Sequence, residues 1–435
     1  MDLAPPPEVT AFIAALDQTQ YLAPDRLVLY QRRLLDKLVR HARAETDFYR
    51  DRLAPLFRAD DSIDWQRWSD VPILRREDAQ ENFEPLRART LPKMAGGPFE
   101  DSSSGSTGRP LRHLQTDIQN LASACAGERF FRWHGLRPAA LTARIRAAVS
   151  PETAYPHGRP ATGWRIGHPA SRVIDLSIAT DTDHQLEWLA RIRPDYLISY
   201  PSNLRELAHR ADELGEELKF EKVLTFGEMV TEDAGLAIRD HFGMAPLDRY
   251  GSSEVGHIAG TCPHSGKHHV SAELVLLELL DDGGNPVEPG TAGRVVITPF
   301  YNLAMPFIRY DLGDYAVLSA EPCGCGRTLP MLERILGRTR NTFRFADGRS
   351  VWPVLLSKDL VRFLAYRQFQ VVQTAPEAVE IRFVPKTPGA PVDHDGLTQY
   401  VRRRLHPSLV VTTREVGEIR RSAGGKFEDY LRLFD

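Results

Sequence analysis

Three short apolar runs follow one another in DYLISYPSNLRELAHRADELGEELKFEKVLTFGEMVTEDAGLAIRDHFGMAPLDRY (residues 195–250). They are DYLISY (195–200), KVLTF (222–226) and APLDRY (245–250), and each is typical of a buried strand. Longer amphipathic segments separate the runs and predict helices. This alternation of strand and helix indicates an α/β protein with a doubly wound, largely parallel sheet.

The two helices of this segment have residues that suit a helix start. Ser202, directly after Pro201, is the expected N-cap of the first helix. The second helix is expected from Thr231, because Glu232 and Asp233 would place acidic side chains in its first turn, where the helix dipole favours them.

Further elements are expected on either side of this segment. Leucines and a tyrosine at spacings of three and four predict a helix over 20–45. Two apolar runs joined by a turn-rich stretch predict an antiparallel hairpin, ELVLLELL (273–280) with RVVIT (294–298). A small α+β unit is expected from about residue 340, with strands near 369–373 and 379–384, a helix near 396–405 and a last strand at 409–416.

Composition limits the class of protein. The chain has 435 residues, which is too long for one compact core and predicts at least two domains. It is 42% hydrophobic and 26% charged, with a net charge of −3, so neither nucleic acid nor an anionic membrane surface is an expected partner. The first residues lack the features of a signal peptide, and four cysteines do not form a disulfide framework. We therefore expect a cytoplasmic protein.

Hydroxyl side chains and glycines are concentrated in DSSSGSTGRPLRH (101–113). Glycines let a backbone approach a ligand, and successive N–H groups with nearby hydroxyls can surround a phosphate. The spacing is not that of a Walker A loop, because no Lys-Ser or Lys-Thr pair follows. From the residues alone, a phosphate-binding loop and a solvated linker are equally good interpretations.

Other polar groups follow the predicted strands. In doubly wound sheets, ligands bind outside the carboxyl ends of the strands, where Pro201, Gly227–Glu228 and Tyr250–Gly251 are expected. Asp314 is expected in a turn after Gly313, ahead of a strand. Taken singly, these motifs are as typical of turns as of a binding site, and GGK near residue 426 is as typical of a frayed tail.

The order of these motifs is more informative than any one of them. SSSGSTGRP, GE, YGSSE, the Asp314 turn, GR and GGK succeed one another as in the adenylate-forming superfamily, which this sequence resembles from about residue 25 onward. The stretch CGCGRTLPMLERILGR (323–338) is similar to the phenylacetate–CoA ligase branch. This resemblance implies an enzyme that activates a carboxylate with ATP as an acyl-adenylate and then transfers the acyl group to a thiol.

The resemblance also implies which residues bind the nucleotide. It implies a phosphate loop formed by Ser103, Ser104, Gly105, Ser106, Thr107 and Gly108. It implies that Gly227 and Glu228 line the adenine pocket. The next motif comprises Tyr250, which packs on the purine, and Gly251, Ser252 and Ser253, the last standing where the family usually has threonine.

Four further residues have implied roles in the reaction. Glu254 would bind Mg²⁺, a hard cation that prefers oxygen ligands. Asp314 and Arg338 would contact the ribose. Lys426 would stabilise the charge that develops as the carboxylate attacks the α-phosphate.

The resemblance implies two domains. The first is a large N-terminal adenylation domain (1–337) built of several subdomains around a parallel sheet. The second is a small mobile α+β domain (338–435) that carries Lys426 and pivots near Asn341, where the superfamily usually has aspartate. The intact set of Lys426, Glu254 and Asp314 argues against a relative that only binds nucleotide.

Three cysteines and a histidine form a second pattern. Cys262, Cys323 and Cys325, with His264, His268 or His269, could provide a structural Cys₃His zinc site. Short members of the branch have a similar pattern, in which His269 fits best. Ordinary reduced thiols are the alternative.

The expected substrates are ATP with Mg²⁺, coenzyme A and a carboxylic acid, for which the resemblance favours an aromatic one. A carrier-protein thiol or an amine is the alternative acceptor. Trp133, Trp164 and Tyr200 are candidates for the acid pocket. A monomer and a homodimer are both compatible with the sequence.

Overall fold

The computed structural model describes residues 6–103, 110–338 and 341–434. Within these ranges, no helix is long and apolar enough to cross a membrane. The chain divides into two compact units. Unit 1 comprises residues 1–139, 162–172 and 248–336, and unit 2 comprises residues 140–161, 173–247 and 337–435.

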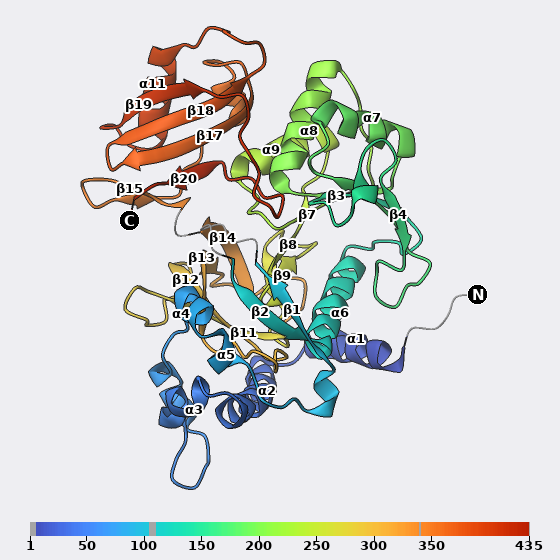
Figure 1. The fold of residues 1–435 in the computed structure, drawn as a ribbon, viewed down its shortest axis with the longest axis vertical. Helices are drawn as coiled ribbons and strands as arrows, with labels where there is room; N and C mark the ends of the chain where they lie inside the picture. Colours follow the sequence, from blue (N-terminus) through green and yellow to red (C-terminus); the bar gives the residue numbers. More distant parts are fainter. Residues whose placement is uncertain (1–5, 104–109, 339–340, 435) are drawn as a thin grey trace. The chain divides into compact units, whose positions relative to one another are not determined.

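Helices at the start of the chain and an antiparallel sheet make up most of unit 1 (Figure 1). Its helices are α1 (Pro7–Thr19), α2 (Pro24–Glu45), α3 (Tyr49–Arg52), α4 (Arg76–Glu81), α5 (Phe83–Leu86) and α6 (Asp117–Trp133), and short 3₁₀ turns are η1 (Ala54–Leu56), η2 (Trp65–Asp70) and η3 (Lys93–Ala95). A two-stranded ribbon pairs β1 (Pro98–Ser102) with β2 (Arg112–Thr116).

The larger sheet of unit 1 has the strand order β11-β12-β13-β14-β10-β9-β8. Its strands are β8 (Leu247–Ser252), β9 (Gly256–Thr261), β10 (His268–Val270), β11 (Val275–Leu280), β12 (Ala292–Pro299), β13 (Tyr310–Leu318) and β14 (Met331–Arg338). The antiparallel pairing of β11 with β12 confirms the predicted hairpin. Side chains from α2, α6 and the sheet share one apolar core, which includes Leu38, Cys125 and Ile297.

The first part of unit 2 contains the parallel strands and alternating helices that the segment 195–250 predicts. The strand order is β7-β6-β3-β5-β4, and β3, β6 and β7 are parallel neighbours. Its elements are β3 (Leu141–Arg146), η4 (Pro151–Thr153), β4 (Arg159–Thr162), β5 (Arg172–Ser177), α7 (Thr182–Ile192), β6 (Tyr196–Ser199), α8 (Pro201–Leu214), β7 (Lys222–Phe226) and α9 (Glu232–Phe242). Apolar side chains from α7, α8 and α9 pack on this sheet around Trp188 and Leu207.

The helix starts of this region were predicted with one error. Thr231 caps α9, because its side chain accepts a hydrogen bond from the Ala234 N–H. Ser202 is not an N-cap: α8 begins at Pro201, and Tyr200 is the capping residue without a side-chain hydrogen bond. Proline suits the first position of a helix because its fixed φ is helical and no N–H is left unsatisfied.

The second part of unit 2 is a four-stranded sheet of order β19-β18-β17-β20. It contains β17 (Tyr366–Ala375), β18 (Ala378–Pro385), α11 (His394–Arg404), β19 (Val410–Glu415) and β20 (Tyr430–Arg432), preceded by β15 (Phe343–Arg344), β16 (Ser350–Val351) and α10 (Ser357–Leu360). The predicted strands and helix are present, and α11 packs on the sheet through Leu397 and Val401 (Figure 1). Strand β20, which the sequence did not predict, pairs in parallel with β17 and fixes the end of the 420–429 segment.

Candidate functional site

The carboxyl ends of β3, β6 and β7 in unit 2 lie side by side, because the three strands are parallel. Tyr200 follows β6, and Gly227–Glu228 follows β7. Gly227 has a φ of +78°, and a Cβ atom there would lie 3.3 Å from the Tyr200 ring and 3.7 Å from Lys426 Cε. Glycine at 227 therefore leaves room for both side chains.

The segment that carries Lys426 is bound to these strand ends. The Tyr200 hydroxyl donates to the Gly424 carbonyl at 2.7 Å. Arg421 donates to the Ser202 hydroxyl at 2.7 Å and lies 3.4 Å from a carboxylate oxygen of Glu206. Burial raises the pKa of Tyr200, so its hydroxyl stays protonated and remains a donor. These contacts hold the GGK motif close to Gly227.

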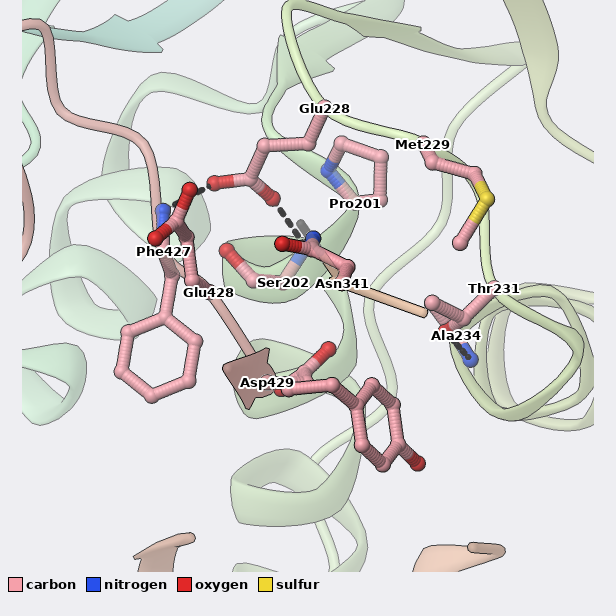
Figure 2. Close-up of a pocket in the computed structure, with 11 residues that line it drawn as sticks. Pro201, Ser202, Glu228, Met229, Thr231, Ala234, Asn341, Phe427, Glu428 and Asp429 are labelled. Atoms are coloured by element: carbon pink, nitrogen blue, oxygen red, sulfur yellow. Dashed lines mark hydrogen bonds between the residues drawn. The ribbon is translucent and has the colours of Figure 1, made fainter. Parts of the chain in front are cut away.

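Glu228 connects the same two segments through its carboxylate (Figure 2). One oxygen accepts from the Phe427 N–H at 2.5 Å, and the other accepts from the Ser202 N–H at 3.1 Å. Burial raises the pKa of Glu228, while Arg421, 3.7 Å away, opposes that shift. The pocket beside it is also lined by Met229, Asn341 and Tyr430.

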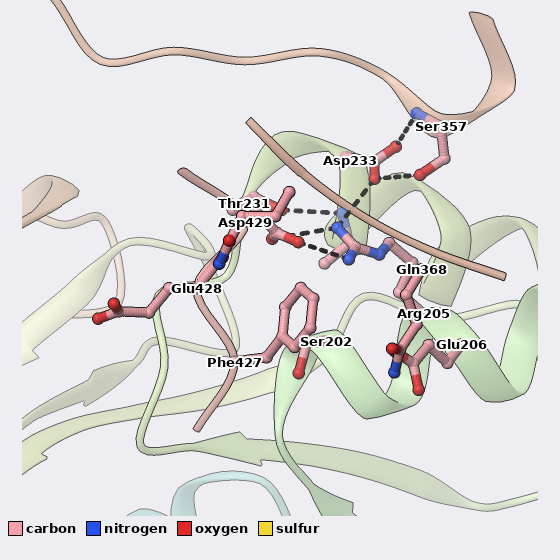
Figure 3. A network of polar contacts seen from close by, with 12 residues as sticks. Ser202, Arg205, Glu206, Thr231, Asp233, Ser357, Gln368, Phe427, Glu428 and Asp429 are labelled. Atoms are coloured by element: carbon pink, nitrogen blue, oxygen red, sulfur yellow. Dashed lines mark hydrogen bonds and ion pairs between the residues drawn. The ribbon is translucent and has the colours of Figure 1, made fainter. Parts of the chain in front are cut away.

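A buried ion-pair network in unit 2 joins α8 and α9 to residues of the C-terminal segment (Figure 3). Arg205 of α8 donates to both carboxylate oxygens of Asp429, at 2.6 and 3.1 Å, and to Asp233 of α9 at 3.2 Å. Asp233 also accepts from the N–H and hydroxyl of Ser357, at 2.6 and 2.5 Å. Burial acts to lower the pKa of Arg205, but Asp429 and Asp233 outweigh it and hold the pKa well above its ordinary value. The guanidinium thus remains charged and bidentate.

In unit 1, the predicted magnesium ligand has a cationic partner that the sequence did not reveal. Glu254 is 4% exposed, and its carboxylate accepts from Arg76 at 3.1 Å and from the Ser253 hydroxyl at 3.2 Å. Arg76 also donates to the Ser103 hydroxyl at 2.6 Å. Arg76 lies 178 positions from Glu254, so no local pattern in the sequence connects the two.

Two other predicted nucleotide-binding residues of unit 1 are hydrogen-bonded to each other. The Tyr250 hydroxyl donates to an Asp314 carboxylate oxygen at 2.7 Å. Asp314 lies inside β13, so the prediction of a turn ahead of a strand was wrong; Gly313, with a φ of +79°, is accommodated within the strand. A Cβ atom at Gly251 would approach the Gly256 carbonyl to 2.5 Å, so the β8–β9 turn requires glycine there. Ser252 stabilises that turn by accepting from the Val255 N–H at 3.3 Å.

The remaining predicted residues are placed as follows. Ser104, Gly105, Ser106, Thr107 and Gly108 lie outside the described residues. Arg338 is the last residue of β14. Of the aromatic candidates, only Tyr200 lies at a strand end; Trp133 packs edge-on against His269, and Trp164 packs against Phe131.

The predicted metal ligands lie together in unit 1. One ligand atom from each of Cys262, His269, Cys323 and Cys325 lies within 4.8 Å of the others. Two of the separations are 3.7 Å, between Cys262 Sγ and Cys323 Sγ, and 3.3 Å, between His269 Nε2 and Cys325 Sγ. A tetrahedral zinc site has S–S edges of about 3.8 Å and S–N edges of about 3.5 Å, so the donor set fits zinc.

The choice among the three histidines follows from their partners. His269 Nδ1 lies 3.2 Å from the Leu329 carbonyl, which directs Nε2 toward the cysteines. His268 Nε2 instead lies 2.9 Å from an Asp248 carboxylate oxygen. The four clustered side chains thus include His269 and not His268 or His264.

Comparison with known proteins gives relatives along most of the chain. No family model matches. The chain is 24% identical over 399 residues to a phenylacetate–coenzyme A ligase of Thermus thermophilus, covering 83% of this chain and 86% of the relative. It is 25% identical over 370 residues to a phenylacetate–coenzyme A ligase of Pseudomonas putida, covering 80% and 79%.

A solved structure has a similar fold. The crystal structure of a 2-hydroxyisobutyryl-CoA ligase in the postadenylation state matches with a TM-score of 0.72 at 18% identity, covering 95% of this chain and 90% of that one. The motif order, the fold and the two full-length relatives agree with one another. Along most of its length, the chain is therefore similar to the phenylacetate–coenzyme A ligases, and it shares the fold of the 2-hydroxyisobutyryl-CoA ligase.

Proposed function

We propose that this protein is an ATP-dependent ligase that converts a carboxylic acid to an acyl-adenylate and then to the thioester of coenzyme A. The observation that carries the proposal is the GGK segment: hydrogen bonds to Tyr200 and Glu228 hold it at the strand ends, with Lys426 beside Gly227. The similarity of the chain to two phenylacetate–coenzyme A ligases supports it.

In the first half-reaction, a carboxylate oxygen of the acid attacks the α-phosphorus of ATP. The bond from that phosphorus to the oxygen bridging to the β-phosphate breaks, and pyrophosphate leaves with the electron pair. Lys426 would stabilise the negative charge on the α-phosphate oxygens as they become crowded in the transition state. Positioning the two substrates together would also accelerate the reaction.

In the second half-reaction, the sulfur of coenzyme A attacks the acyl carbonyl carbon. The C–S bond forms, the C–O bond to AMP breaks, and the thiol proton passes to solvent. A carrier-protein thiol or an amine would react in the same way, so the acceptor has to be established by experiment. We propose an aromatic acid as the first substrate class to test, following the relatives' names.

We further propose the nucleotide-binding roles that the family resemblance implies. Tyr250 and Asp314, already hydrogen-bonded to each other, would contact the purine and the ribose, and Arg338 would reach the same sugar. Gly227 and Glu228 would line the adenine pocket, with Ser103–Gly108 around the phosphates.

Glu254 is the residue that would hold Mg²⁺. Its buried carboxylate provides hard oxygen ligands, and Arg76 donates to both this carboxylate and the Ser103 hydroxyl. In this structure, Arg76 supplies the positive charge next to the carboxylate. When bound, the ion would neutralise phosphate charge and orient the leaving pyrophosphate.

The proposal is tested by acid-dependent exchange of labelled pyrophosphate into ATP, screened across aromatic and aliphatic acids. Thioester formation is then measured with coenzyme A, a carrier protein and amines. Exchange with none of the acids would contradict the proposed function, and exchange without a CoA product would contradict the acceptor.

We propose that residues 338–435 form the mobile domain and that the Arg205–Asp429 pair holds it for adenylation. Because a second orientation for thioester formation would have to break this pair, Asp429→Asn should slow adenylation about tenfold and leave the conversion of supplied acyl-adenylate unchanged. Each half-reaction is measured separately by stopped-flow kinetics.

The control is Lys386→Gln, which removes a partly exposed ion pair with Glu213 in the same unit. Exposed pairs contribute little, so both half-reactions should stay within about twofold of the wild type. Equal slowing of both half-reactions by Asp429→Asn would show that the pair only stabilises the fold.

We also propose a structural zinc ion at Cys262, His269, Cys323 and Cys325. Protein purified without added metal should contain about one zinc per chain by elemental analysis. Chelation should lower the unfolding temperature, since metal binding is coupled to folding.

Two variants separate the zinc site from ordinary buried thiols. Cys325→Ser should lose the metal, whereas Cys125→Ser, a buried thiol in α6 outside the cluster, should keep it. Equal zinc content in the two variants would contradict the assignment.

A further inference from the structure

An excess of positive charge lies on one face of β3 in unit 2. Arg144 and Arg146 alternate with Ala143 and Ile145, whose side chains pack in the apolar core on the other face. The neighbouring carboxylate is that of Asp175 on β5. Arg144 donates to both of its oxygens, at 2.5 and 2.9 Å, and Arg159 lies 3.8 Å from it. Asp175 is thus already engaged by two arginines.

Arg146, in contrast, is not bound to Asp175. It makes no hydrogen bond or ion pair with any described residue, and its Nε atom is buried without a partner. Burial lowers the pKa of Arg146, and the charge of Arg144 lowers it further. Arg146 is half-buried, and the Asp175 carboxylate that acts on it is already bound by Arg144, so the charge of Arg146 is only partly balanced. Buried polar groups in proteins are nearly always paired. An anion bound at Arg146 would complete that balance.

The position of Arg146 relates it to the proposed site of reaction. In the parallel register of β3 with β6, Arg144 pairs with Ile198, so two residues further on Arg146 is beside Tyr200. The Ala147 N–H lies 3.3 Å from the Tyr200 hydroxyl, which in turn donates to Gly424 in the segment of Lys426. Arg146 therefore lies at the same end of the sheet as the lysine.

We propose that Arg146 binds a second anionic group, in the simplest case a second carboxylate, on the acid that the enzyme activates. This inference rests on the proposed function. The first carboxylate has to react next to Lys426, so the second group would be the part of the acid that reaches β3. The planar guanidinium of an arginine can bind both oxygens of a carboxylate, which is the strongest geometry for this pair.

The test compares acids that differ only in the second anion. Phenylacetate is paired with 4-carboxyphenylacetate, and butyrate with succinate, in pyrophosphate exchange. Wild-type enzyme should use the diacid of a pair with at least tenfold higher kcat/KM. Arg146→Gln should lower kcat/KM for the diacid about 10–10²-fold, which corresponds to a charge-assisted hydrogen bond, and change that for the monoacid less than threefold. Arg146→Lys should restore part of the preference.

The matched control is Arg172→Gln, which removes the same charge from an exposed position at the start of β5 and should leave the preference intact. Calorimetric titration of the wild type and Arg146→Gln with each acid, without ATP, gives a readout independent of turnover. The diacid should bind the wild type more tightly than the monoacid, and only its binding should weaken in the variant.

The outcomes are distinct. Exchange with monoacids only, or equal losses for both members of a pair in Arg146→Gln, would overturn this inference and leave the proposed function standing. Exchange with no acid would overturn the proposed function, and the titration would then decide the role of Arg146 alone. Equal affinity of the wild type for both members of a pair would contradict the proposed binding of a second anionic group by Arg146.

Discussion

Replacing Lys426 by alanine is expected to slow acyl-adenylate formation by about 10²–10³-fold, the usual effect of removing one positioned electrostatic donor. The lysine belongs to the segment that Tyr200 and Glu228 hold at the strand ends. Once pyrophosphate has left, it has no charge to stabilise. The variant should therefore still convert supplied acyl-adenylate and coenzyme A to the thioester at a nearly normal rate, as single-turnover assays of each half-reaction can measure.

Lys358→Ala is the matched control for this experiment. Lys358 is an exposed lysine of α10 in the same C-terminal segment, and its removal should affect neither half-reaction more than twofold. If Lys426→Ala damages both half-reactions equally, the lysine is not specific to adenylation and the interpretation of the GGK motif is wrong.

Glu254→Gln should reduce adenylation to a similar extent, by about 10²–10³-fold. The substitution keeps the shape of the side chain and one oxygen that can accept from Arg76, while the amide NH2 can donate to the Ser253 hydroxyl; it removes the charge that would hold Mg²⁺. Pyrophosphate exchange, measured over a range of Mg²⁺ concentrations, should show both a lower maximal rate and a higher requirement for the metal. Thermal unfolding should show that the protein remains folded.

The neighbouring carboxylate of Glu77 provides the comparison. Glu77 is exposed on α4, next to Arg76, and Glu77→Gln should leave both the rate and the Mg²⁺ requirement unchanged. A wild-type Mg²⁺ dependence in Glu254→Gln would remove this residue from the list of metal ligands.

The elements that could be predicted from the sequence are those determined by residues close together in the chain. The strands β6 and β7 and the cap of α9 follow from short apolar runs and one threonine, which depend on neighbours in the chain. The error at Ser202 arose between two local rules, because proline at the first helical position displaced the serine from the cap.

The parts that the sequence did not predict depend on contacts between distant residues. Arg76 pairs with Glu254 across 178 positions, and Arg205 pairs with Asp429 across 224. The residues that flank Arg76 and Arg205 in the sequence do not distinguish these two arginines from the many arginines that lie on the surface. Strand β20 has only three residues, and its parallel pairing with β17, not its own composition, makes it a strand. The cluster of His269 with three cysteines was predictable because cysteines are few, so their spacing is informative.

The two apolar cores of unit 2 are built from separate segments of the chain, which affects how such enzymes can diversify. The apolar core around Phe369 and Ile381 is made only of residues from 343–430, whereas the core around Trp188 and Leu207 is made only of residues from 143–242. A genetic crossover between residues 336 and 343 would therefore leave both cores intact. The recombinant would need compatible partners at the polar positions that join the two segments, among them Arg205, Glu228 and Asp429. Segments from different ancestors could thus be combined in one gene, with selection acting mainly on those polar contacts.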